Sequence, residues 1–156
     1  MSSKEMFVRF LNTNNQTRFA PDDIEIEAVT ALSLEPDTIN TRVGYKILKQ
    51  DGLESGYIGR TLDYRRLAVR EVLGEEPISI PLSHWDEPPQ LERVIEVINT
   101  MFVVEDGEGD SSFDVVDFHP PARLYPDDDN RHEYLIEARD ESLRFISNFI
   151  IKPEAS

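Results

Sequence analysis

The acidic segment 106–110, Asp-Gly-Glu-Gly-Asp, is the part of the sequence whose residue types and spacing come nearest to a chemical site. Alternating carboxylates after a helical pattern, with Asp114 and Asp117 following, are typical of a calcium loop, because Ca²⁺ prefers many oxygen ligands. The match is poor, since Ser111 stands where the loop needs a glycine and Asp117 replaces the bidentate glutamate. We interpret the segment as a solvated acidic loop, with calcium binding as the alternative.

No other group of residues forms a catalytic pattern. The three histidines (His84, His119 and His132) lack metal-ligand spacing, and the chain has no cysteine. Neither a Gly-x-Ser-x-Gly elbow nor a glycine-rich phosphate loop with a following lysine is present. Asp127-Asp128-Asp129 reads as a solvated loop, because three consecutive carboxylates cannot all point at one ion. We therefore expect a non-enzymatic protein with no catalytic residues, cofactor, metal or small-molecule substrate.

Charge is spread unevenly along the chain, whose net charge is −15. Residues 41–70 carry seven Lys/Arg against three Asp/Glu, whereas residues 71–141 carry twenty Asp/Glu against four Arg. The acidic total disfavours general binding to nucleic acid or to an anionic membrane. One interpretation is a solvated surface that keeps the protein soluble. The other is a head-to-tail contact between a basic patch and an acidic patch on protein neighbours.

The second interpretation predicts an assembly interface made of exposed charged residues. Its members are Arg42, Lys46, Arg60, Arg65, Arg66, Asp106, Glu108, Asp110, Asp127, Asp128 and Asp129. Aromatic neighbours of the arginines leave phosphate or RNA as an alternative ligand, but in so acidic a chain we expect a protein counterpart.

The first half of the chain predicts one helix and three strands. A capping box at Ser2-x-x-Glu5 starts a helix that ends near Asn12–Asn15. Alternation predicts a strand at 24–28. A hairpin of 41–49 and 56–64 follows, joined by Asp51-Gly52.

The second half predicts a similar order after a connector, 71–87. Pro88-Pro89 opens a helix that continues to Phe102, because proline is tolerated in a first turn. A short strand at 113–118 and a hairpin of 133–138 and 143–151 follow. The last strand is apolar on both faces, so we expect it to be central or covered by an interface.

The two halves align with each other in sequence. Phe7–Thr13 matches Val94–Thr100, each an apolar helical run closed by Asn-Thr, and Tyr57–Leu62 matches Phe145–Ile150. We therefore expect one α+β domain, 1–156, in which an antiparallel sheet packs against two helices. It would consist of two pseudo-repeats of helix, strand and β-hairpin, 1–70 and 88–152, joined by the connector 71–87.

The N-terminal sequence Met1–Glu5 contains no apolar signal segment, and no run approaches the length needed to span a bilayer. We expect a soluble protein made inside the cell, without a membrane partner.

The segments Asn40–Val43 and Ser55–Leu67 resemble a pattern of virion structural proteins from large tailed phages, the phiKZ-like jumbo phages among them. There, Asn-Thr leads one strand, and Gly-Tyr-x-Gly leads a second strand that ends in Tyr-Asn-Arg-hydrophobic. Here Arg65 stands where that pattern has Asn. Leu11–Asn15 and Ala138–Leu143 are similar to the start and finish of the same family.

The resemblance implies a non-enzymatic particle component that is made in the cytoplasm of the host bacterium and located in the virion. Such modules look like interaction units of the tail, the baseplate or a related assembly, with virion proteins or further copies of the chain as partners. An alternative from another class is a small acidic phage protein that sequesters a host factor by imitating nucleic acid. An enzyme is the third interpretation.

Overall fold

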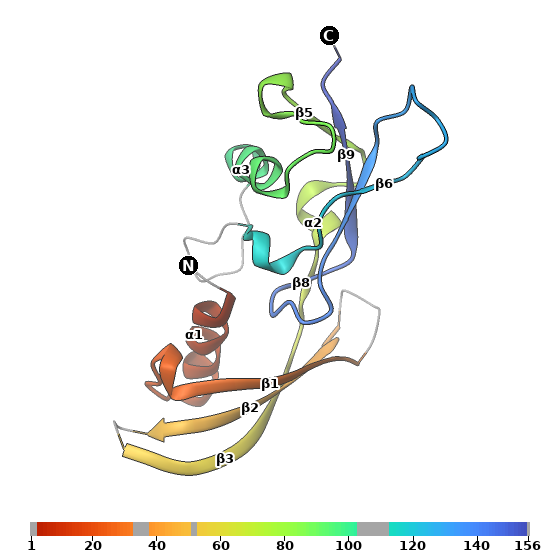
Figure 1. Ribbon diagram of the computed structural model, residues 1–156. Coiled ribbons are helices and arrows are strands. Elements are labelled where there is room, and N and C mark those ends of the chain that lie inside the picture. The colour runs from red at the N-terminus through yellow and green to blue at the C-terminus, as the bar shows by residue number, and fades with distance from the viewer. Residues whose placement is uncertain (1–2, 33–37, 51–52, 103–112, 156) are drawn as a thin grey trace. The chain divides into compact units, whose positions relative to one another are not determined.

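The computed structural model describes residues 3–32, 38–50, 53–102 and 113–155 (Figure 1). The fold is mixed α+β with antiparallel sheets, in agreement with the predicted class. The chain divides into two compact units. Unit 1 comprises Met1–Leu67 and Asp140–Arg144, and unit 2 comprises Ala68–Arg139 and Phe145–Ser156. The predicted connector is thus part of unit 2, and a short distant segment belongs to unit 1.

Unit 1 consists of a helix that lies against one face of a three-stranded antiparallel sheet (Figure 1). Its elements are α1 (Ser3–Asn15), the 3-10 helix η1 (Pro21–Asp23), β1 (Ile24–Ala31), β2 (Thr41–Gln50) and β3 (Leu53–Tyr64), with sheet order β1-β2-β3. The predicted helix, first strand and hairpin are confirmed. The predicted turn, Asp51-Gly52, lies outside the described residues.

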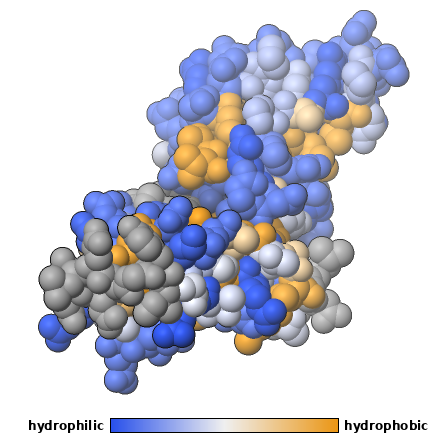
Figure 2. All heavy atoms as spheres, turned by 60° about the horizontal axis from the view of Figure 1, so that its bottom comes forward, coloured by the Kyte–Doolittle hydropathy of each residue, from blue (hydrophilic) through white to orange (hydrophobic). Residues whose placement is uncertain are grey.

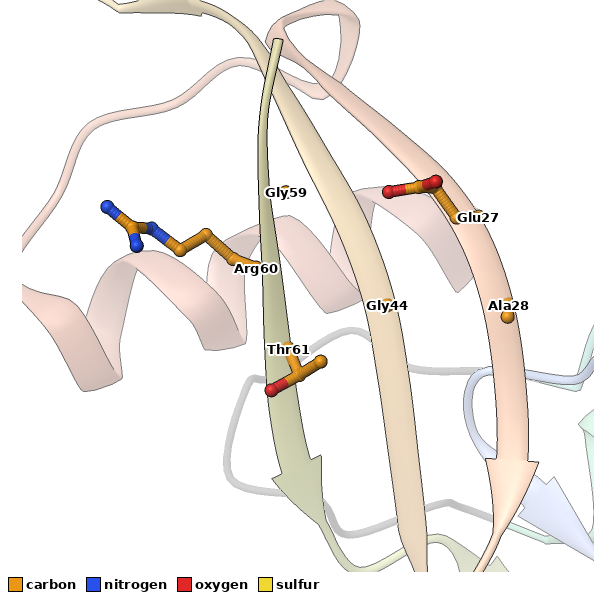
Figure 3. Close-up of a pocket in the computed structure, with 6 residues that line it drawn as sticks. All are labelled: Glu27, Ala28, Gly44, Gly59, Arg60 and Thr61. Atoms are coloured by element: carbon orange, nitrogen blue, oxygen red, sulfur yellow. The ribbon is translucent and has the colours of Figure 1, made fainter.

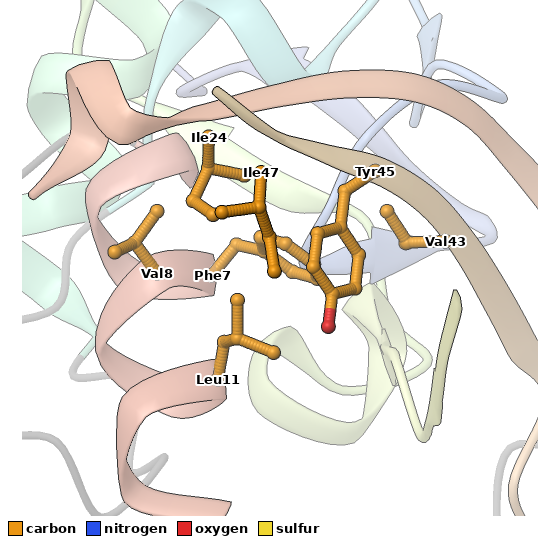
Figure 4. Packing of buried hydrophobic residues seen from close by; sticks show 7 residues of the cluster. All are labelled: Phe7, Val8, Leu11, Ile24, Val43, Tyr45 and Ile47. Atoms are coloured by element: carbon orange, nitrogen blue, oxygen red, sulfur yellow. The ribbon is translucent and has the colours of Figure 1, made fainter. Parts of the chain in front are cut away.

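The core of unit 1 lies between α1 and the sheet (Figure 4). Helical spacing places three apolar side chains of α1 on one face, and strand alternation directs every second side chain of β2 toward them. The buried cluster consists of Phe7, Val8, Leu11, Ile24, Val43, Tyr45 and Ile47.

Unit 2 contains a four-stranded sheet of order β5-β9-β7-β6, in which β5 and β9 are parallel and the other pairs are antiparallel. Its elements are α2 (Val69–Leu73), β5 (Ile78–Ile80), η2 (Leu82–His84), α3 (Leu91–Met101), η3 (Val115–Asp117), β6 (Ala122–Arg123), β7 (Tyr134–Glu137), β8 (Phe145–Ile146) and β9 (Asn148–Pro153). The short strand β4 (Leu67–Ala68) crosses the boundary, because Leu67 is the last residue of the first segment of unit 1.

Aromatic side chains form the centre of unit 2. Phe113 stacks on Phe145 with ring centroids 5.0 Å apart, and Phe118 meets Phe149 edge-on at 5.8 Å. All four rings are buried. Offset and edge-on contacts of this kind stabilise a core beyond the area that they bury.

Three predictions for the second half require correction. The helix α2 was not expected, and α3 begins at Leu91, after the two prolines. The predicted strand 113–118 contains the 3-10 helix η3 at its centre, because the Asp114 carboxylate accepts a hydrogen bond from Val116 N at 3.2 Å and holds a turn there. Only Phe118 pairs in extended form, with Ala138. The predicted central position of the last strand is confirmed, since β9 lies between β5 and β7.

Near its C-terminal end, each of the two long helices carries an asparagine that binds the main chain of a phenylalanine twice. Asn12 donates to Phe19 O and accepts from Phe19 N, each at 2.9 Å. Asn99 donates to Phe113 O at 3.0 Å and accepts from Phe113 N at 2.8 Å. We call these two arrangements the asparagine clamps. Each clamp satisfies backbone groups where the chain leaves a helix.

No helix in the described residues is both long and apolar enough to cross a membrane.

Candidate interaction surfaces

Two basic residues of β2 lie in ion pairs with acidic residues on the neighbouring strands. Arg42 binds Asp63 through two hydrogen bonds, Nε to Oδ1 at 2.8 Å and Nη2 to Oδ2 at 2.9 Å. Lys46 Nζ lies 3.7 Å from Glu27 Oε2. Two of the five cations of the predicted interface are therefore compensated within unit 1, and the hairpin is less basic than its sequence indicates.

Arg66 is buried, with 3% of its surface exposed, so the prediction that it is an exposed contact is wrong. Its Nε donates to Thr41 Oγ1 at 2.6 Å, and its Nη1 donates to the carbonyl oxygens of Asp140 and Ser142 at 2.9 and 2.8 Å. Burial lowers the pKa of the Arg66 guanidinium, and the charges of Tyr64 and Asp140 oppose that shift. The side chain holds the segment Asp140–Arg144 to the rest of unit 1.

Asn40 completes this polar core. Its Nδ2 donates to Arg66 O at 3.0 Å, and its Oδ1 accepts from Arg66 N at 2.8 Å. A buried cation needs such fully satisfied surroundings, because each missing hydrogen bond would leave a desolvation cost. Nothing in the sequence distinguishes Arg66 from the exposed Arg65 beside it, so only the fold reveals the difference.

The outer face of the unit 1 sheet, opposite α1, is hollow and carries small residues (Figure 3). Arg60 is exposed and points away from this face. The hollow has a volume of about 610 Å³ and is lined by Glu27, Ala28, Gly44, Gly59, Arg60 and Thr61. A side chain added at Gly44 would meet no atom within 4 Å, so the space above the strands is open.

The predicted acidic contacts divide into two groups. Asp127 and Asp129 are exposed, whereas Asp128 accepts hydrogen bonds from Arg123 at its main-chain oxygen and from Asn130 N at its carboxylate, each at 3.0 Å. The other three, Asp106, Glu108 and Asp110, lie outside the described residues. Within the described ranges, no three His, Cys, Asp or Glu side chains are grouped so that they could hold a metal ion.

Acidity is concentrated in unit 2. Its sequence carries six Lys/Arg against nineteen Asp/Glu, a net charge of −13, whereas unit 1 carries ten against twelve, a net charge of −2. At the level of the units, the contrast is between a strongly acidic unit and a nearly neutral one.

An apolar groove opens on unit 2 beside the start of α3. Its volume is about 490 Å³, and Phe118 lines it together with Val116, whose surface is 60% exposed. The remaining lining residues are Pro88, Pro89, Gln90, Leu91, Glu92, Val115, Pro120, Pro121 and Arg139. The molecular surface shows such apolar areas within a largely hydrophilic exterior (Figure 2).

A cluster of polar and aromatic side chains surrounds the Glu87 carboxylate, which directly precedes the groove residue Pro88 in the sequence. Glu87 Oε1 accepts from Trp85 Nε1 at 2.9 Å, and Oε2 accepts from the Tyr134 hydroxyl at 2.8 Å. His132 Nδ1 lies 2.9 Å from Glu87 Oε1. The rings of Trp85 and Tyr134 also meet edge-on, 5.7 Å apart. The cluster thus joins the segment before the groove to β7.

The surroundings of Glu87 favour its ionised form. Burial raises the pKa of Glu87. Hydrogen bonds from Trp85 and Tyr134 and the charges of His132 and Arg123 together lower it by more, so the pKa lies below its ordinary value. Burial and the Glu87 carboxylate together raise the pKa of the Tyr134 hydroxyl. Sequence reasoning missed this cluster, because its members are brought together only by the packing of distant segments.

No protein-family model, no curated protein and no solved structure matches the chain.

Proposed function

We propose that this chain is a non-enzymatic structural protein of a tailed-phage virion, in the tail, the baseplate or another part of the particle. It acts through contacts with other virion proteins or with copies of itself. The observation that carries the proposal is the apolar groove on the acidic unit 2, in which Val116 is 60% exposed. Exposed apolar surface with a polar rim is typical of protein interaction sites.

The groove is suited to an apolar anchor side chain of a partner. Proline pairs on two segments (Pro88-Pro89 and Pro120-Pro121) form much of its lining, and proline has little backbone freedom to lose on binding. Glu92 lies at the rim, and unit 2 as a whole carries −13. Basic residues flanking the anchor would therefore be attracted.

We also propose that the two units descend from one duplicated element, as the sequence alignment predicts. The matching order of elements supports this: helix, asparagine clamp, 3-10 helix and three-stranded antiparallel meander, α1-η1-β1-β2-β3 in unit 1 and α3-η3-β6-β7-β9 in unit 2. Each 3-10 helix starts two residues after the clamped phenylalanine, Phe19 or Phe113. A fully buried apolar residue, Ile24 or Phe118, follows each 3-10 helix.

A charge placed in the groove tests the proposed function. Val116→Asp would put a carboxylate among apolar walls, and the matched control Leu82→Asp adds the same charge at an equally exposed apolar residue of unit 2 outside the groove. Each variant is supplied during infection by a phage that lacks the wild-type gene. The amount of the protein in purified particles is then measured.

We expect Val116→Asp to reduce incorporation at least about tenfold, which corresponds to 1.4 kcal/mol of contact energy, while Leu82→Asp is incorporated normally. Fluorescence of Trp85, the only tryptophan, checks that unit 2 is folded in both. Normal incorporation of Val116→Asp would contradict the assignment of the groove as an assembly contact.

A second function, sequestration of a host protein, is favoured by the concentration of charge in unit 2. A protein that imitates nucleic acid presents dense negative charge to a basic partner. This candidate predicts a soluble monomer that binds a basic host protein in infected cells, with an affinity that falls steeply as salt is raised.

A further inference from the structure

The third strand of the meander has different neighbours in the two units. In unit 2, β9 lies between β7 and a further strand, β5. In unit 1, the corresponding strand β3 pairs only with β2 and is an edge strand of the described sheet. Unit 1 therefore lacks the strand that completes the sheet of unit 2.

The strand pairings show which residues correspond. The first buried residue after each 3-10 helix pairs in antiparallel fashion: Ile24 pairs with Ile47 of β2, and Phe118 forms an isolated bridge with Ala138, the residue directly after β7. We therefore treat Ile47 and Ala138 as equivalent positions.

Counting back from these positions extends the correspondence to the third strands. Val43 and Tyr134 each lie four residues before the equivalent position. Val43 pairs with Leu62, and Tyr134 pairs with Ile151. The strand pairings thus make Leu62 of β3 the equivalent of Ile151 of β9, one residue beyond Ile150, which the sequence alignment matches with Leu62.

The added strand β5 covers β9 at this position. Ile78 pairs with Ile151, and Ile80 O accepts a hydrogen bond from Glu154 N at 2.8 Å. Ile151 is fully buried there, whereas Leu62 on the open β3 is only partly buried. The open edge therefore leaves apolar surface of the unit 1 core uncovered.

The main-chain groups of β3 are oriented to accept a strand. Tyr64 O accepts from Asn40 N at 3.2 Å, so Tyr64 directs its main-chain groups toward β2. Because successive residues of a strand alternate, Leu62 also faces β2, whereas Thr61 and Asp63 direct their N–H and C=O groups away from it. These outward groups form the hydrogen-bonding edge.

We propose that the β3 edge at Leu62–Tyr64 binds an extended segment of a neighbouring protein as a parallel strand, the position that β5 occupies on β9. The segment carries an apolar–polar–apolar triplet, because alternate side chains must cover Leu62 and Tyr64, as Ile78 and Ile80 do in unit 2. Its middle residue is polar, since it lies beside the exposed ion pair of Asp63 and Arg42. This partner class deepens the proposed function and rests on it.

Two observations argue against β5 as the occupant of the β3 edge and against β1 as the binding edge. Its own β5 already pairs with β9 in unit 2. The opposite edge, β1, has an irregular register between Ile26 and Ala28 and carries Glu25 and Glu27, features that protect an edge strand from pairing. The β3 edge at Leu62–Tyr64 lacks such an irregularity.

Removal of one outward N–H tests the proposal. Asp63→Pro deletes that donor without touching the β2 pairing, because proline is tolerated at edge positions. Its control Asp63→Ala loses the same ion pair with Arg42 but keeps the N–H. A random peptide library displayed on yeast is sorted for binding to the wild-type protein, and the selected peptides are then measured against both variants.

We expect selected peptides to carry the apolar–polar–apolar triplet, to bind Asp63→Pro at least about tenfold more weakly than Asp63→Ala, and to shift the amide resonances of Leu62–Tyr64 in the wild-type protein. Thr61→Pro and Thr61→Ala form a second pair in case Asp63→Pro does not fold. Equal binding to the proline and alanine variants, or no selected peptide, would overturn the proposal. If the wild-type protein forms a dimer and the proline variants abolish it, the β3 edge binds a second copy of this chain and the proposed partner is wrong. Neither result depends on virions, so failure here is distinct from failure of the proposed function.

Discussion

Asn12 and Asn99 hold similar positions in their units: each lies near the C-terminal end of a long helix and makes two hydrogen bonds to the main chain of a phenylalanine. The loops that the clamps close differ in length, because Phe19 follows Asn12 by seven residues and Phe113 follows Asn99 by fourteen. The two units therefore share the bonding of the clamp but not the length of the connection that it closes.

Alanine at either clamp should destabilise the protein. Asn12→Ala and Asn99→Ala each leave two main-chain groups without a side-chain partner, and we expect a loss of about 1–3 kcal/mol in the free energy of unfolding in urea. Asn14→Ala is the control, because the exposed Asn14 makes a single hydrogen bond to Phe10 O. Trp85 lies in unit 2, so its fluorescence reports Asn99→Ala directly. Equal stability of all three variants would contradict the structural role of the clamps.

Replacement of Arg66 should be far more costly than replacement of an exposed arginine. Arg66→Ala removes three side-chain hydrogen bonds and leaves the carbonyl groups of Asp140 and Ser142 unsatisfied, so we expect a loss of about 2–4 kcal/mol. Arg42→Ala, which breaks an exposed ion pair, should change stability little. Urea unfolding followed by circular dichroism compares the two. Similar effects for both would show that Arg66 does not hold Asp140–Arg144.

The stability contribution of Glu87 should depend on pH. Its pKa is lower in the folded protein than the ordinary value of 4.5, so the contribution is fully present above about pH 4.5 and is lost as the pH falls through the lower folded value. Glu87→Gln should therefore destabilise the protein at neutral pH, and the difference from wild type should shrink in acid. The exposed Glu154→Gln serves as control. A difference independent of pH would contradict an ionised Glu87.

Much of the fold was predictable, because local patterns specify it. Helical spacing in Phe7–Leu11 and alternation in Val43–Ile47 identify their elements and core faces directly. The strand prediction at 113–118 was wrong because the capping carboxylate of Asp114 outweighs the apolar character of its neighbours. The parallel β5 could not be predicted, since its partner β9 lies about seventy residues away and three residues carry no register signal.

The interaction surfaces were less predictable than the fold. Charge alone selected Arg42 and Lys46. Their partners Asp63 and Glu27 lie on the neighbouring strands β3 and β1, so the charges are compensated only once the sheet forms. Arg66 was selected for the same reason and is buried. Sequence counts record charge without its partners, which decide whether a charged residue is available for binding.

Quantitative mass spectrometry of purified particles of the encoding phage, with head and tail fractions separated, tests the central claim most directly. A structural part of the virion should be present in a fixed stoichiometric amount in one fraction, and we expect that fraction to be the tail or baseplate. Absence from both fractions, with abundant protein in infected cells, would contradict a structural role in the virion and favour the host-binding alternative.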